Sequence, residues 1–136
     1  MATISRTKAS LRIAGDDLIP REITNLLGHA PTFEQTKGQI IVGKNTGKER
    51  EVTFGMWRLH ATEAEPGDID SQIFEILDKL TEDITIWQSL SAQYDIDLFC
   101  GLFMDNEIEG ISIYPKALSA LGERGIEIGF DIYGPD

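Results

Sequence analysis

Two histidines and one cysteine are the side chains best suited to general-base or nucleophilic chemistry. His29 follows a predicted helix C-terminus, where the helix dipole favours a cation and gives a structural role. His60 ends a predicted strand beside Arg58, and as a general base it would need a nucleophile or an orienting carboxylate within reach. Cys100 lies in the middle of an apolar strand, where burial keeps a thiol protonated and unreactive. These residues favour a protein that is not an enzyme.

The sequence also predicts no metal site and no bound cofactor. It contains no Cys-x-x-Cys and no His-x-x-x-His pair, the usual spacings of zinc ligands. Asp105, Glu107 and Glu109 cluster near a turn, but without the spacing and the central glycine of a calcium-binding EF-hand loop. The glycine-rich segment 43–48 lacks phosphate-loop spacing, since Glu49 stands where that loop has Ser or Thr.

Aromatic and arginine side chains, which are frequent anchors of binding interfaces, form a candidate contact site. The residues of this site are Trp57, Arg58, His60, Tyr114 and Tyr133. An alternative function uses four of them, Trp57, Arg58, His60 and Tyr133, as a pocket for a small molecule or a substrate. Arg58 would then clamp an anionic ligand through its guanidinium.

The charge distribution points to a different surface. The chain of 136 residues has a formal net charge of −11, which argues against general binding to nucleic acids. Nine basic and six acidic side chains occur up to Arg58, against three basic and seventeen acidic ones after it. We expect Asp95, Asp97, Glu107 and Glu109 to form an acidic face for a basic protein partner. An immunity-type inhibitor of a basic toxin is one form of this function.

Hydrophobic periodicity predicts the elements of the first half. Residues 7–13 alternate as a half-buried strand. A helix follows, with Asp17 as the expected N-cap, Pro20 in the first turn and Gly28 as the terminating residue. We expect a loop over 29–37 and a hairpin of strands 39–42 and 51–60.

The second half predicts two helices from 68–71 onward, with a break at 81–83. A most apolar, central strand follows over 96–104, then a strand at 111–113, a helix from Pro115 that stops at Gly122, and a strand over 126–132. The expected order is β-α-β-β-α-α-β-β-α-β. It predicts one α+β domain over 1–136, with an antiparallel or mixed sheet of about five to six strands and helices packed on one face.

Three segments together resemble a bacterial family, the domain of unknown function 4279. They are Pro20–Gly28 followed by Pro31, Gly55–Leu59, and Leu118–Gly122 followed by Ile126–Tyr133. The resemblance spans nearly the whole chain. It implies a small bacterial α+β domain with no established activity, so it transfers no catalytic residues.

The remaining expectations concern location and assembly. The first residues lack the apolar stretch of a signal peptide, no apolar run is long enough for a membrane helix, and a single cysteine fits a reducing compartment. We therefore expect a cytoplasmic protein without membrane contacts. The last strand, if it lies at a sheet edge, also offers a route to a homodimer.

Overall fold

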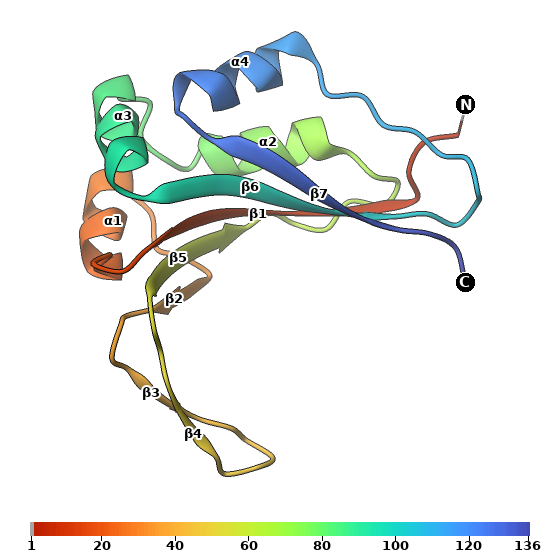
Figure 1. Ribbon diagram of the computed structural model, residues 1–136. Coiled ribbons are helices and arrows are strands. Elements are labelled where there is room, and N and C mark those ends of the chain that lie inside the picture. The colour runs from red at the N-terminus through yellow and green to blue at the C-terminus, as the bar shows by residue number, and fades with distance from the viewer. Residues whose placement is uncertain (1) are drawn as a thin grey trace.

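The computed structural model describes residues 2–136 and contains a five-stranded sheet, a separate two-stranded hairpin and four helices (Figure 1). The elements are β1 (Arg6–Gly15), α1 (Pro20–Leu27), β2 (Phe33–Gln35), β3 (Ile40–Val42), β4 (Glu49–Glu51), β5 (Gly55–His60), α2 (Ile69–Leu77), α3 (Ile84–Gln93), β6 (Asp95–Phe103), α4 (Pro115–Glu123) and β7 (Glu127–Tyr133). The large sheet has the order β2-β5-β1-β6-β7. Its neighbours are antiparallel except for β6 and β7, which are parallel, so the α+β class with a mixed sheet is confirmed.

One face of the sheet carries the core, and the other is free of helices. Along β1 the buried residues Thr7, Ala9, Leu11 and Ile13 alternate with partly or fully exposed ones, as the sequence predicts. Figure 1 shows α2, α3 and α4 above the sheet, and α1 at one end adds Ile23 and Leu27 to the same core. We call the opposite, uncovered side the open face.

Local chemistry explains where most helices begin and end. Pro20 opens α1, and Gly28 ends it with φ of 86°, a left-handed conformation that glycine adopts without a Cβ clash. Asp68 and Asp83 cap α2 and α3 by accepting backbone hydrogen bonds from Ser71 and Thr85. The prediction of Asp17 as the cap of α1 is wrong, because Ile19 holds that position without a side-chain bond.

A buried polar network joins α2 to β1. The Thr7 hydroxyl donates to Gln72 Oε1 at 2.9 Å and accepts from the Asp68 backbone at 3.0 Å. Gln72 Nε2 in turn donates to the carbonyls of Thr7 and Thr62, both at 2.9 Å. The two polar side chains are therefore satisfied inside the core, which fixes the position of the helix on the strand.

Two predicted strands and one predicted loop differ from the structure. The segment predicted as one strand over 51–60 is divided: Glu49–Glu51 pairs with Ile40–Val42, whereas Gly55–His60 pairs with β1 and β2. The predicted loop 29–37 contains β2, which has three residues and is too short to show alternation. The segment predicted as a strand at 111–113 is irregular, because Ile111 and Ile113 pack on the core without a neighbouring strand.

Two further predictions need small corrections. The most apolar strand, β6, lies inside the sheet but not at its middle, which is occupied by β1. Helix α4 continues through Gly122 to Glu123, and Gly125 rather than Gly122 takes the left-handed conformation, with φ of 71°.

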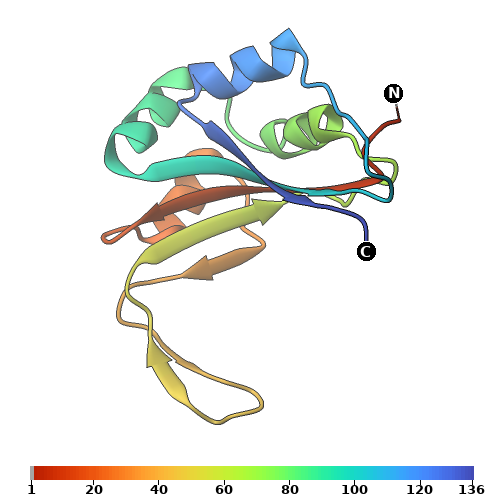
Figure 2. The same cartoon turned by 45° about the vertical axis from the view of Figure 1, so that its right-hand side comes forward.

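The β3–β4 hairpin projects from the body as an arm, on the side away from the helices (Figures 1 and 2). Most of its side chains are exposed, including Ile40 and Val42. The buried Val52 lies at its base, where Val52 N–H donates to Gln39 O at 2.8 Å. The arm and the open face together make the uncovered side of the molecule.

Candidate functional site

The open face combines arginine side chains with aromatic rings. The guanidinium of Arg6 lies 4.0 Å from the Phe103 ring centroid, that of Arg12 lies 4.6 Å from Phe99, and that of Arg58 lies 5.3 Å from Phe33. Each contact joins neighbouring strands: β1 with β6 in two cases and β5 with β2 in the third. Cation–π packing of this kind holds the side chains upright on a surface that no helix covers.

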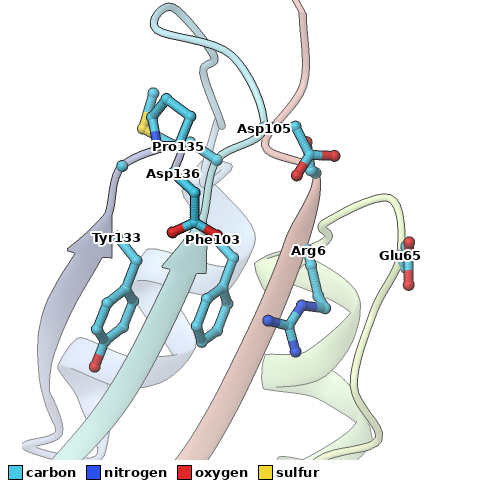
Figure 3. Close-up of a pocket in the computed structure, with 10 residues that line it drawn as sticks. Arg6, Glu65, Phe103, Asp105, Tyr133, Pro135 and Asp136 are labelled. Atoms are coloured by element: carbon cyan, nitrogen blue, oxygen red, sulfur yellow. The ribbon is translucent and has the colours of Figure 1, made fainter.

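A pocket of about 500 Å³ lies on this face at the C-terminal ends of β6 and β7 (Figure 3). Phe103 and Tyr133 are stacked at its edge, with centroids 4.8 Å apart and planes 7° from parallel. Arg6 lies on the other side of Phe103, so that a cation and two rings form a row across three strands. We call this site the aromatic pocket.

Carboxylates surround the aromatic pocket. Glu65, Asp105 and Asp136 line it, and within residues 2–136 none of the three forms an ion pair. Arg6 is already neutralised by Glu63 at 2.7 Å, and this hydrogen bond lowers the pKa of the Glu63 carboxyl. The charge left available in the pocket is therefore negative.

Glu109 stabilises the loop that carries Asp105, one of the three carboxylates that line the aromatic pocket. Its carboxylate accepts hydrogen bonds from the Ser5 backbone and hydroxyl at 3.0 and 2.9 Å, and from the backbones of Asp105 and Asn106 at 3.3 and 3.2 Å. Burial raises the pKa of Glu109, but the bonds from Asn106 and Ser5 outweigh it and lower the pKa overall. Glu109 thus ties Asp105 and Ser5 together through its carboxylate.

The predicted contact residues do not gather at one place. Trp57 is fully buried on the helix-covered face, where its Nε1 donates to Thr24 Oγ1 at 3.0 Å, so its predicted role as a surface contact is wrong. Arg58 and His60 lie on the open face of β5. Tyr114 is exposed at the N-cap of α4, and Tyr133 lines the aromatic pocket.

The strand register separates the residues of the predicted alternative pocket. Arg58 on β5 is opposite Arg12 on β1, and Arg12 is opposite Asp97 on β6. Tyr133 on β7 is opposite Phe103 on β6, and Phe103 is opposite Arg6 on β1, which lies six residues before Arg12. At about 3.3 Å per residue, this places Arg58 and Tyr133 roughly 20 Å apart along the strands as well as three strands apart. The geometry gives Arg58 no part in a pocket with Tyr133.

The four predicted acidic residues fall into two pairs at opposite ends of β6. Asp95 and Asp97 stand at its beginning, and the carboxylate of Asp97 pairs with Arg12. Glu107 and Glu109 lie in the loop after its end, beside Asp105. The second pair is thus adjacent to the aromatic pocket, and the first pair is distant from it.

Two of the residues considered for catalysis, His60 and Cys100, have shifted pKa values. Burial first, and the charge of Arg58 second, lower the pKa of His60, which has no carboxylate partner in the described chain. Burial raises the pKa of the Cys100 thiol to about 12, with a smaller contribution from Asp97. Across residues 2–136, no group of three or more His, Cys, Asp or Glu side chains is arranged to hold a metal ion.

Sequence reasoning missed Arg6 and Phe103, the two residues that complete the row with Tyr133. The alternation of inward and outward side chains along the two strands gives a signal for both residues. Phe99 and Phe103 occupy the outward positions of an apolar strand, and Arg6 and Arg12 the outward positions of its neighbour. Their pairing depends on the register between strands more than 80 residues apart in the chain, which alternation within one strand does not give.

No helix within residues 2–136 has the length and apolar character needed to cross a membrane. Comparison with known proteins gives one family: the model described as "Domain of unknown function (DUF4279)" matches residues 5–135. Neither the curated proteins nor the solved structures contain a match to the chain.

Proposed function

Because the chain belongs to the DUF4279 family, we propose from its geometry that it is a non-enzymatic binding domain that holds a basic side chain of a partner protein in the aromatic pocket. The observation that carries this proposal is the stacked Phe103–Tyr133 pair beside three carboxylates that form no ion pair within residues 2–136. Carboxylates accept the parallel hydrogen bonds of a guanidinium or the single bonds of an ammonium. The aliphatic stem of the same side chain packs against aromatic rings.

Arg6 already makes, within the chain, the contacts proposed for the partner's basic side chain. Its own guanidinium lies against Phe103 and pairs with Glu63, which is the arrangement that a ligand cation would repeat with Asp105 or Asp136. The pocket is open to solvent, and the large excess of acidic residues would draw a basic protein toward it. Inhibition of a basic toxin, whose cations would otherwise bind phosphate, is one form of this function.

The test uses blocked single amino acids as probes. N-acetyl-arginine amide and N-acetyl-lysine amide are titrated into the labelled protein, with N-acetyl-glutamine amide as the neutral control, and amide chemical shifts are followed by NMR. We expect shifts concentrated at residues 103–105 and 133–136 for the cationic probes, weakened by salt. The variant Y133A and the double variant D105N/D136N should abolish them.

Asp131 provides the matched control, because it lies on the same strand face two residues before Tyr133 but does not line the pocket. D131N should leave the shifts unchanged. In affinity capture from cell lysate, proteins bound by the wild type and by D131N but not by Y133A would be the candidate partners. Shifts that persist in D105N/D136N, or their absence with both cationic probes, would refute the proposal.

A further inference from the structure

The two edges of the large sheet differ in length. β2 is a three-residue edge, whereas β7 at the other side has seven residues and pairs only with β6 within the described chain (Figure 2). On β7, Phe130 is 41% and Ile132 is 64% exposed. A long apolar edge strand offers a row of unpaired backbone groups to another strand.

The hydrogen bonds show which backbone groups of β7 are free. The N–H of Met104 donates to the carbonyl of Tyr133 at 3.0 Å, so the backbone groups of Tyr133 face β6. Because successive residues of a strand direct their N–H and C=O groups to opposite sides, the groups of Ile128, Phe130 and Ile132 face outward. The side chains of the same three residues all lie on the helix-covered side, as those of their partners Leu98, Cys100 and Leu102 do.

We propose that β7 is a self-association strand, which pairs antiparallel with β7 of a second copy about a two-fold axis at Phe130. In this register Phe130 faces Phe130 of the second copy, and Ile128 faces Ile132 of the second copy. All three positions carry outward backbone groups, so each becomes a hydrogen-bonded pair of the antiparallel ladder. The apolar side chains left exposed on one copy cover those of the other.

Charge selects this register over its neighbours. With the axis at Phe130, Glu127 faces Tyr133 of the second copy and Asp131 faces Gly129, so no two carboxylates are opposite each other. An axis at Gly129 would place Glu127 opposite Asp131, and an axis at Asp131 would place two copies of that carboxylate face to face. Like charges directly opposite destabilise a strand pair, so the Phe130 register is the self-complementary one.

The resulting dimer would join two five-stranded sheets into one of ten strands. This interaction surface rests on different observations from the basic-side-chain proposal and adjoins the aromatic pocket at Tyr133, and the two respond to salt in opposite directions. Each copy carries a net charge of −11, so the copies repel one another and added salt strengthens their association. Salt weakens the capture of a cation in the aromatic pocket.

Disulfide trapping tests the axis directly. In a hydrogen-bonded antiparallel pair the Cα atoms are about 5.5 Å apart, which suits a disulfide, and the single native cysteine is buried. We expect F130C to form a covalent dimer with itself under mild oxidation. I128C and I132C should not do so alone but should cross-link when mixed. Self-cross-linking of I132C, or none by F130C, would overturn the register.

Sedimentation velocity over a wide range of protein concentration tests the association itself. The wild type should dimerise, more tightly at moderate than at low salt, and the double variant F130K/I132K should raise the dissociation constant about tenfold or more, since four like charges then meet at one seam. The matched control is L26K, because Leu26 is 45% exposed and lies on α1, which contacts β5 on the other side of β1 from β7. A wild type that stays monomeric at millimolar concentration, or a double variant that dimerises like L26K, would refute the proposal.

Discussion

Arg6 connects an aromatic ring to a carboxylate, and its two neighbours hold the guanidinium over the open face. Its bond to Glu63 lowers the pKa of that carboxyl below the ordinary value of 4.5. A carboxyl with a lowered pKa in the folded state stabilises the fold above the unfolded pKa, and this contribution disappears as the pH falls through the folded value. Because both side chains are well exposed, the contribution of this pair to stability is small.

We predict that R6Q raises the pKa of Glu63, since the hydrogen bond from Arg6 and its positive charge, which both lower that pKa, are lost. The change is measured by NMR titration of the Glu63 side-chain carboxyl between acidic and neutral pH. R12Q is the control, because Arg12 pairs with Asp97 and does not reach Glu63. A Glu63 titration that is the same in R6Q and wild type would contradict the assignment of the shift to Arg6.

Cys100 should be unreactive in the folded protein. Its side chain is fully buried, and its pKa of about 12 leaves almost no thiolate at pH 8. A thiol reagent such as Ellman's reagent should therefore label Cys100 slowly in buffer and completely in denaturant. Rapid labelling at pH 8 without denaturant would show that this part of β6 opens readily.

At the scale of elements, the Thr7–Gln72 network fixes α2 on β1. The substitution Q72L removes the amide oxygen and the amide nitrogen of Gln72. The Thr7 hydroxyl hydrogen and the Thr62 carbonyl then lose their hydrogen-bond partners. We predict a loss of about 2 kcal/mol in the free energy of unfolding, as is typical of buried polar groups left unpaired. Urea denaturation measures this loss, with Q88L on the exposed side of α3 as a control that should stay within about 0.5 kcal/mol.

Two glycines should respond in opposite directions to the same substitution. Gly28 has φ of 86° and Gly122 lies inside α4, and an added Cβ would meet no atom within 4 Å at either position. G28A should lose about 1 kcal/mol from backbone strain alone, whereas G122A should gain about 0.5 kcal/mol from a lower entropy cost. Thermal unfolding of both variants checks the signs, and equal effects would contradict this explanation.

Periodicity was sufficient where an element is long and buried on one side. It predicted β1, β6, β7 and all four helices, and the break expected at 81–83 lies between α2 and α3, where Asp83 caps α3. It failed for β2, which has three residues, and at 111–113, where alternation reflects packing on the core without strand pairing. The aromatic pocket depends on the register between β1, β6 and β7, so only Tyr133 among its three packed side chains was predicted.

At the scale of the whole molecule, the arm formed by β3 and β4 is separable from the core. We predict that replacing residues 40–51 with a two-residue Asn-Gly turn preserves the fold, because Gln39 and Val52 are already hydrogen-bonded at the base of the arm. The free energy of unfolding should change by less than about 1 kcal/mol, since nearly all removed side chains are exposed. Circular dichroism and urea denaturation measure the outcome. A collapse of cooperative unfolding would show that the arm supports the sheet.

The position of β1 also governs the order in which the protein can form during translation. β1 is made before the other strands of this sheet, yet it is the middle of the sheet, and its two neighbours end at His60 and Phe103. The nascent chain must therefore leave one edge of β1 unpaired until β6 has emerged from the ribosome. Pairing between strands so distant in sequence makes folding slow. Chaperones that hold emerging apolar strands would therefore be needed most by this chain between the synthesis of β5 and that of β6.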